Sequence, residues 1–164
     1  MPAASAPTAC KRVLAVDDEP AICELVREAL SGPGISVDTA CSAQEAIQLY
    51  RDHEYDLITL DCFMPGISGV ELHHALSNLY GFGRRLSPLL PQRLPPVLVI
   101  TGYSRHPALQ DLIFAERVVG ILQKPVAPKE LAMLVRDILG WEDARTVRRA
   151  KALERLEGHL LSMN

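Results

Sequence analysis

The stretch "VLAVDDEP", residues 13–20, decides the fold and raises the question of function. Its apolar first half predicts a short buried strand. The strand runs into Asp17, Asp18 and Glu19, with no basic residue among them. Adjacent carboxylates repel each other, and a buried carboxylate is unfavourable unless a partner compensates its charge. Glu19 is expected to face outward, where its negative charge suits the start of a helix, so Asp17 and Asp18 need partners from elsewhere.

Strand and helix patterns alternate five times along the 164 residues. Short runs that are apolar on both faces predict strands at 13–16, 35–40, 56–60, 96–101 and 118–123. Apolar residues three or four apart predict helices within 19–34, where Gly32-Pro33-Gly34 ends the helix, and at 42–53, 68–79, 106–118 and 128–139. Two of these helices open with a capping box, Ser42 with Glu45 and Ser68 with Glu71. The alternation predicts an α/β fold, a doubly wound parallel sheet with helices on both faces.

In a fold of this kind, ligands bind at the carboxyl ends of the strands. Five polar residues stand at these ends: Asp17 and Asp18 after the first strand, Asp61 after the third, Thr101 on the fourth and Lys124 after the fifth. A single acid there is usually only a turn residue, so the prediction rests on all five meeting at one rim. Carboxylates suit Mg²⁺, a lone carboxylate suits a nucleophile, and a hydroxyl with an ammonium group suits phosphoryl oxygens. The sequence therefore predicts a phosphoryl-transfer site.

Four motifs, "VLAVDDEP", "DLITLDCFMPGISGVEL", "VLVITGY" and "ILQKP", resemble the receiver domains of two-component response regulators over about residues 12–139. The resemblance implies a flavodoxin-like sheet of five parallel strands in the order 2-1-3-4-5. It implies that Asp61 accepts a phosphoryl group, in the presence of Mg²⁺, from a sensor histidine kinase or a histidine phosphotransfer protein. The chain would then signal by phosphorylation-dependent contact with an unknown target protein, and would not be an enzyme acting on other molecules.

The resemblance also assigns roles to the residues of the rim. Mg²⁺ would be held by four ligands, namely the carboxylates of Asp17, Asp18 and Asp61 and the backbone carbonyl of Phe63. Mn²⁺ or Ca²⁺ could replace it in a crystal. Thr101 would be the switch hydroxyl, and Lys124 would pair with a phosphoryl oxygen. The peptide bond between Lys124 and Pro125 would be cis.

Three residues depart from the family pattern. Ile121 stands three positions before Lys124, where the family usually has Tyr or Phe. Backbone movement is therefore expected to carry the signal in place of a turning aromatic ring. Phe63 and Tyr103 occupy positions that tune the lifetime of the phosphoryl group in the family. Two readings stay open for them: they obstruct the attacking water, or they only pack over the rim.

Two other classes of function remain as alternatives. Phosphatases of the haloacid dehalogenase type also use an aspartyl nucleophile, Mg²⁺, Thr and Lys, but they need a second Asp two residues after the nucleophile. This chain has Phe63 there, which disfavours that class. A pseudo-receiver is an interaction domain that is never phosphorylated. Ile121 favours it mildly, whereas the intact acids, Thr101 and Lys124 argue against it.

The chain is predicted to have three parts and an insertion. Residues 1–11 read as a disordered lead-in, 12–139 as the receiver domain and 140–164 as an amphipathic C-terminal helix. Residues 80–96 read as an extended surface loop between the third helix and the fourth strand. Two surfaces are candidates for homodimerisation: the fourth helix with the fifth strand and fifth helix, or the C-terminal helix.

Composition limits the partners further. A formal net charge of −3 and 5% aromatic residues argue against a nucleic-acid partner. No apolar run approaches the ~20 residues of a membrane span. The four cysteines have neither zinc nor C-x-x-C spacing, so reduced thiols in a cytoplasmic protein are expected. His53, His73 and His74 lie on predicted helices and are expected to face solvent.

Overall fold

The computed structural model describes residues 10–86, 94–103 and 105–140. Its five-stranded parallel sheet has the order β2-β1-β3-β4-β5, which confirms the predicted doubly wound α/β fold. The strands are β1 (Lys11–Val16), β2 (Ile35–Ala40), β3 (Leu57–Leu60), β4 (Val97–Thr101) and β5 (Val118–Gln123). The helices are α1 (Pro20–Leu30), α2 (Ala43–Asp52), α3 (Gly69–Leu86) and α4 (Ala108–Ile113), followed by a helix at residues 128–140.

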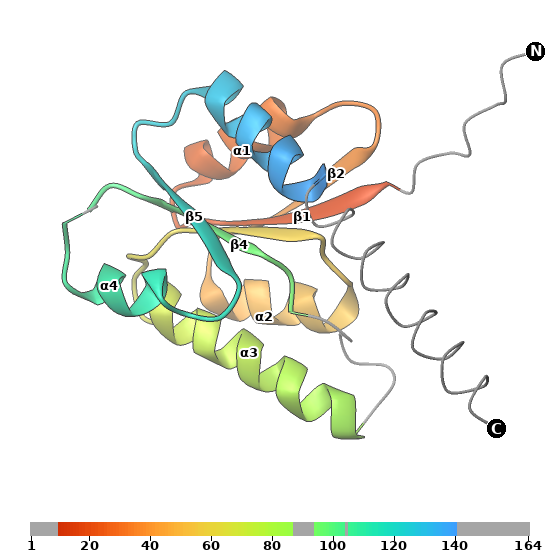
Figure 1. Cartoon of the computed structure of the whole chain (residues 1–164), viewed down its shortest axis with the longest axis vertical. Coiled ribbons are helices and arrows are strands. Elements are labelled where there is room, and N and C mark those ends of the chain that lie inside the picture. Colours follow the sequence, from red (N-terminus) through yellow and green to blue (C-terminus); the bar gives the residue numbers. More distant parts are fainter. Residues whose placement is uncertain (1–9, 87–93, 104, 141–164) are drawn as a thin grey trace, which may run out of the picture.

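Helices cover both faces of the sheet (Figure 1). α1 and the helix of residues 128–140 lie on one face, and α2, α3 and α4 lie on the other. Successive strand residues point to opposite faces of the sheet. Val13 and Ala15 therefore pack in the hydrophobic core under α1, whereas Leu14 and Val16 pack in the core under α2, α3 and α4. Burial on both sides explains why the central strands are mostly apolar.

The predicted helix starts are confirmed. The N–H of Glu45 donates to Oγ of Ser42 at 3.2 Å, at the start of α2. Before α3 the box is reciprocal, since the N–H of Ser68 donates to Oε2 of Glu71 at 2.8 Å and the N–H of Glu71 donates to Oγ of Ser68 at 3.2 Å. This second box fixes where the chain enters α3, directly after the loop that leaves Asp61.

The predicted loop at 80–96 is wrong in its first part, because α3 continues to Leu86. Leu79 and Tyr80 pack against the hydrophobic core, which extends the apolar side of the helix past the predicted end. Gly81 weakens a helix but does not end one when such packing continues. Residues 87–93 lie outside the described residues, and 94–96 lead into β4.

The helix predicted at 106–118 is also shorter, because α4 spans only Ala108–Ile113. Leu109 and Leu112 are its buried residues, and Phe114, the residue after its last turn, is 88% exposed. The chain must turn here to enter β5, and Arg117 makes the turn with a left-handed φ of 68°. Tertiary geometry thus ends a helix that the local pattern would have continued.

The ends of the chain need one correction. Lys11 belongs to β1, so the predicted lead-in at 1–11 is too long. The rest of that lead-in and the predicted helix at 140–164 fall mostly outside the described residues and stay predictions. Within the described part of the chain, no helix combines the length and the apolar character that crossing a bilayer requires.

A glycine fixes the distance between α3 and the end of β3. A Cβ on Gly69 would collide with the backbone carbonyl oxygen of Asp61 and would stand 2.8 Å from Cα of Cys62. The N–H of Gly69 donates to the carbonyl of Cys62 at 3.0 Å, which holds the two segments together. Any larger residue must therefore displace the strand end that carries Asp61.

We expect Gly69→Ala to lower the free energy of unfolding by about 2 kcal/mol, because the new methyl group meets backbone that cannot give way. Urea denaturation of the two proteins measures the difference. Gly81→Ala in the same helix is the matched control, because a Cβ there meets nothing within 4 Å. It should stabilise the protein by about 0.5–1 kcal/mol. Equal effects of the two substitutions would contradict the close approach.

Candidate functional site

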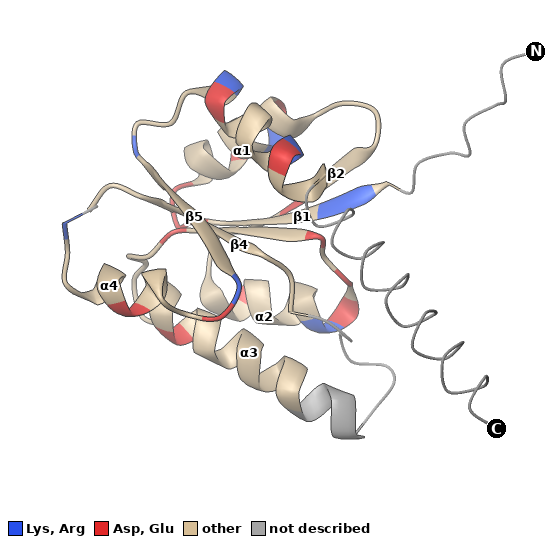
Figure 2. Ribbon diagram, in the orientation of Figure 1, with Lys and Arg blue, Asp and Glu red and all other residues tan. Residues whose placement is uncertain are grey.

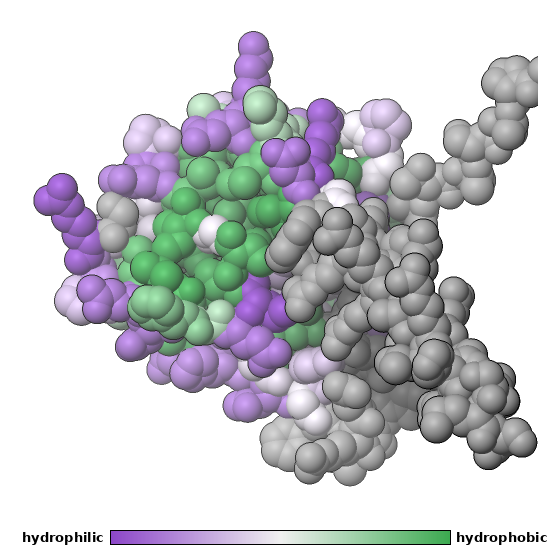
Figure 3. Space-filling model, in the orientation of Figure 1, coloured by the Kyte–Doolittle hydropathy of each residue, from purple (hydrophilic) through white to green (hydrophobic). Residues whose placement is uncertain are grey.

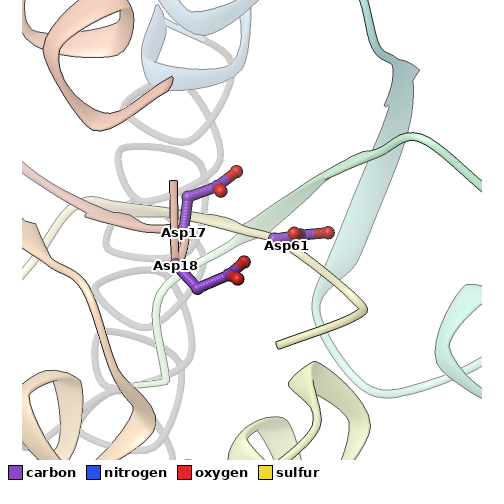
Figure 4. Close-up of side chains that lie close together, drawn as sticks. All are labelled: Asp17, Asp18 and Asp61. Carbon is purple, nitrogen blue, oxygen red and sulfur yellow. The ribbon is translucent and has the colours of Figure 1, made fainter. Parts of the chain in front are cut away.

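The register of the sheet brings the predicted acids together. Val16 of β1 pairs with Leu60 of β3, so Asp17 and Asp61 leave the sheet side by side. One carboxylate oxygen from each of Asp17, Asp18 and Asp61 lies within 4.8 Å of the others. Figure 4 shows the three carboxylates pointing to the same side of the strand ends. The prediction that these acids from distant parts of the chain meet at one rim is confirmed in geometry.

The two acids nearest the sheet are buried. Asp17 is 3% exposed and Asp61 is 5% exposed, whereas Asp18 is half-buried. The N–H of Glu19 donates to Oδ1 of Asp17 at 3.0 Å, and the N–H of Phe63 donates to Oδ1 of Asp61 at 3.2 Å. Oδ2 of Asp17 is buried and receives no hydrogen bond of regular geometry.

Lys124 supplies positive charge to this cluster. Its Nζ lies 2.8 Å from Oδ2 of Asp17, 3.0 Å from Oε1 of Glu19 and 3.3 Å from Oδ2 of Asp61. The peptide bond between Lys124 and Pro125 is cis, as predicted. The contact with Glu19 was missed by the sequence analysis, which expected this side chain to face outward at the start of a helix.

The pKa values of Asp17 and Lys124 reflect the burial of the cluster and the contacts within it. Burial raises the pKa of Asp17 above its ordinary value, even though Lys124 and the N–H of Glu19 oppose the shift. Burial alone would lower the pKa of Lys124, but its close contacts with the carboxylates of Asp17 and Glu19 outweigh burial and raise it. The lysine is therefore firmly charged, while Asp17 is still not fully compensated.

The residues of the rim fit a divalent cation. The carboxylates of Asp17, Asp18, Glu19 and Asp61 exceed the single positive charge of Lys124. A buried carboxylate oxygen without a regular donor, beside two further carboxylates, is the kind of oxygen ligand set that Mg²⁺ prefers. The backbone carbonyl of Phe63, the fourth predicted ligand, stays a prediction.

Thr101 ends β4 and is completely buried. Its Oγ1 accepts a hydrogen bond from the N–H of Tyr103 at 3.2 Å, and its carbonyl accepts one from the N–H of Lys124 at 2.9 Å. The residue is thus tied both to the loop that leads to α4 and to the lysine of the cluster. Movement of its side chain would release the first of these ties.

Three rings stand together beside the rim. The ring of Phe63 meets the ring of Tyr103 edge to face, with centroids 5.1 Å apart. It meets the ring of His106 in the same way at 4.5 Å. The sequence analysis named Phe63 and Tyr103 but missed His106, which it placed at the start of the helix predicted at 106–118 and gave no role. Such edge-to-face contacts hold the rings in a group rather than leaving each free in solvent.

Ile121 is partly buried and packs against the core cluster that contains Leu109 and Leu112 of α4. The side chain therefore lies between β5 and α4, on the route from the rim to the surface. An isoleucine there has no polar group that could turn from solvent to the interior with the Thr101 hydroxyl.

The expectation that the helical histidines face solvent is wrong for His73. This residue is 2% exposed, whereas His74 is exposed. Nε2 of His73 lies 2.8 Å from the carbonyl oxygen of Glu116 and donates to it, while Nδ1 has no partner. Burial lowers the pKa of His73, so the ring is held neutral between α3 and the turn before β5. The sequence analysis did not separate His73 from His74, because two adjacent residues of the same type differ only in the side of the helix on which they lie.

Comparison with known protein families assigns most of the chain. A family model described as the response regulator receiver domain matches residues 13–136. The response regulator MprA of Mycobacterium leprae is 33% identical over 135 residues, which cover 78% of this chain and 50% of MprA. The probable transcriptional regulator ycf27 of Cyanidium caldarium is 30% identical over 134 residues, which cover 77% of this chain and 45% of that protein. The chain thus spans about half the length of these curated relatives.

Solved structures agree with this assignment. A receiver domain protein from Methanospirillum hungatei superposes with a TM-score of 0.69 at 22% identity, covering 84% of this chain and 99% of that one, which supports the fold alone. The chemotaxis protein CheY4 of Vibrio cholerae superposes with a TM-score of 0.65 at 27% identity, covering 79% of this chain and 99% of its own.

The buried His73 predicts a pH-dependent stability. Its pKa is lowered in the fold, so the unfolded chain binds the proton more readily as pH falls below the ordinary value of 6.5. The free energy of unfolding should therefore be complete above that value and decrease as pH falls through it. Urea denaturation at about pH 7.5 and about pH 5.5 measures this decrease.

His73→Gln should remove part of the decrease, because Gln can still donate to the carbonyl of Glu116 but does not titrate. His74→Gln is the matched control at the neighbouring exposed ring and should leave the decrease intact. The same pH dependence in all three proteins would contradict a neutral buried His73.

Proposed function

The chain belongs to the response regulator receiver domain family, and we propose that Asp61 is its phosphoacceptor, with a sensor histidine kinase or a histidine phosphotransfer protein as donor. The family is one of signalling domains of two-component systems. The observation that carries the proposal is the meeting of Asp17, Asp18 and Asp61 within 4.8 Å, with Lys124 against two of them.

The proposed reaction is a transfer between two protein side chains. A carboxylate oxygen of Asp61 attacks phosphorus, and an O–P bond forms as the N–P bond to the donor histidine breaks. The imidazole leaves with the electron pair and takes a proton from solvent. Lys124, with Nζ already 3.3 Å from Oδ2 of Asp61, neutralises an oxygen of the arriving group.

Asp17 and Asp18, together with Asp61 and the carbonyl of Phe63, are the proposed holders of Mg²⁺. When bound, the ion would neutralise negative charge on the acids and on the phosphoryl oxygens. The fit rests on the buried Oδ2 of Asp17 and on the excess of carboxylates over ammonium groups at the rim.

Thr101 is the proposed start of the output. In the structure its Oγ1 accepts from the N–H of Tyr103. A phosphoryl group on Asp61 would offer a stronger, charged acceptor, and the hydroxyl would turn to donate to it. That turn gives up the hydrogen bond to Tyr103 and frees the loop before α4. Backbone movement can then carry the signal where Ile121 cannot.

The surface that responds is proposed to be α4, β5 and the helix of residues 128–140. α4 is short and follows the loop that Thr101 controls, so a small shift there alters its position against β5. A phosphorylation-dependent change of this surface would select the target protein. The same surface, or the C-terminal helix predicted at 140–164, is the proposed contact of a homodimer.

We expect Asp61→Asn to abolish labelling by acetyl phosphate in the presence of Mg²⁺, because the amide is not a nucleophile. Intact mass measures the added phosphoryl group. Chelation of the metal should abolish labelling of the wild type as well. Asp56→Asn, a conservative change at an acid far from the rim, should leave labelling unchanged.

Labelling of Asp61→Asn equal to that of the wild type would assign the phosphoryl group to another residue. No labelling of the wild type, together with no response of the rim to beryllium fluoride in NMR, would favour the pseudo-receiver. Turnover of an aryl phosphate would favour the phosphatase.

We expect Phe63→Asn to shorten the lifetime of the phosphoryl group about tenfold, because loss of the ring opens the rim to an attacking water. Loss of label over time after removal of acetyl phosphate measures the rate. Phe114→Asn makes the same substitution at an exposed ring on the far side of α4 and should not change it. If both variants lose the label as slowly as the wild type, the rings only pack over the rim.

A further inference from the structure

One face of the molecule is apolar and exposed. We call it the β5 face and define it by Ile113, Phe114, Val119, Ile121 and Met133. Ile113, Phe114 and Met133 are 42%, 88% and 68% exposed, and the two β5 residues are partly exposed between them. Figure 3 shows apolar side chains gathered where Figure 1 places β5, between α4 and the helix of residues 128–140.

The β5 face also includes an unpaired strand edge. Among the described strands, β5 pairs with β4 alone, so its outer edge is open. An open apolar edge and a Phe side chain almost wholly in water are unfavourable, and soluble proteins seldom keep a contiguous patch of this kind without a partner for it. The face therefore indicates an occupant.

Charge near the face narrows the choice of occupant. Asp111 and Glu116 are both exposed on its α4 side. Figure 2 shows acidic residues on α4 and on the turn that leads into β5. Arg117, the basic residue of that turn, donates from Nε to the carbonyl of Leu94 and is directed to the protein. An occupant with an apolar stripe flanked by basic side chains would complement this surface.

Residues 141–164 of the same chain have that composition. Apolar residues recur three or four apart, at Val147, Ala150, Leu153, Leu156, Leu160 and Met163. Basic residues accompany them at Arg145, Arg148, Arg149, Lys151 and Arg155, and acidic residues at Glu142, Asp143, Glu154 and Glu157, so the excess of basic residues lies within residues 144–153. This spacing is typical of an amphipathic helix that needs a surface on which to bury one side.

The point at which residues 141–164 begin also allows them to reach the β5 face. The segment starts directly after Gly140, the last residue of the helix that carries Met133. As a helix, its 24 residues would span about 36 Å, whereas a strand of six residues such as β5 spans about 20 Å. After one reversal the segment is long enough to cover the face.

We propose that residues 141–164 pack their apolar stripe on the β5 face of their own chain, with basic side chains near Asp111 and Glu116. The tether at Gly140 gives the segment an effective concentration in the millimolar range, which a second copy reaches only at high protein concentration. The inference goes beyond the proposed function and does not require phosphorylation of Asp61. Its consequence is that a partner of the β5 face must first displace the segment.

Hydrogen exchange of the full-length chain tests the proposal, with substitutions first in the segment and then in the β5 face. The chain is measured at a concentration where it sediments as a monomer. Leu153→Glu with Leu156→Glu should make the amides of residues 113–123 exchange about tenfold faster, while those of β2 stay unchanged. Phe114→Glu with Met133→Glu should have the reciprocal effect on residues 147–160. Both face residues are exposed, so the fold should survive their substitution.

Gln44→Glu with Gln48→Glu is the matched control, because it adds the same two charges at exposed positions of α2. It should leave exchange in both regions as in the wild type. Protection that disappears on dilution, with a dimer in sedimentation, would show that a second copy covers the face and would overturn the proposal. So would unchanged exchange at 113–123 in the tail variant, or faster exchange only at the groove of about 500 Å³ beside Leu25 and Pro128.

Discussion

The contact on which the rim depends is that of Lys124 with the carboxylates of Asp17 and Asp61. Parallel pairing of β1 with β3 forces two buried acids into one space, and the sheet by itself offers them only backbone N–H groups. The lysine reaches them from the end of β5, two strands beyond β3 in the sheet. It thereby ties the edge of the sheet to its centre, although it leaves negative charge uncompensated.

That remaining charge gives the rim its chemistry. A fully paired cluster would be a structural network, whereas here one lysine is shared by Asp17, Glu19 and Asp61, and Asp18 lies within 4.8 Å of two of these acids. Stability must then come from elsewhere, and the apolar strands supply it: all four residues of β3 are buried, directly before Asp61. Gly69 preserves the position of the strand end that carries Asp61, the proposed phosphoacceptor, by letting α3 approach the backbone at that point. The free energy lost by burying the acids is thus offset by the packing of the same strands that hold them in place.

The errors of the sequence analysis share one cause. α3 runs past its predicted end because Leu79 and Tyr80 find core to pack against, and α4 stops early because the chain has to turn at Arg117. Of the two adjacent histidines, His73 is the one that faces the turn before β5. Each outcome was settled by what lies opposite a residue in space, and a local pattern contains no such information.

By itself, the sequence determined the alternation of strands and helices, the capping boxes, and the set of acids, hydroxyl and lysine at the strand ends, because these are patterns within a few residues of one another. The tertiary structure alone decided that Glu19 joins Lys124, that His106 completes the group of rings, that His73 is buried, and that β5 presents an apolar face. These depend on contacts between elements, whose geometry follows from the packing of the whole sheet with its helices.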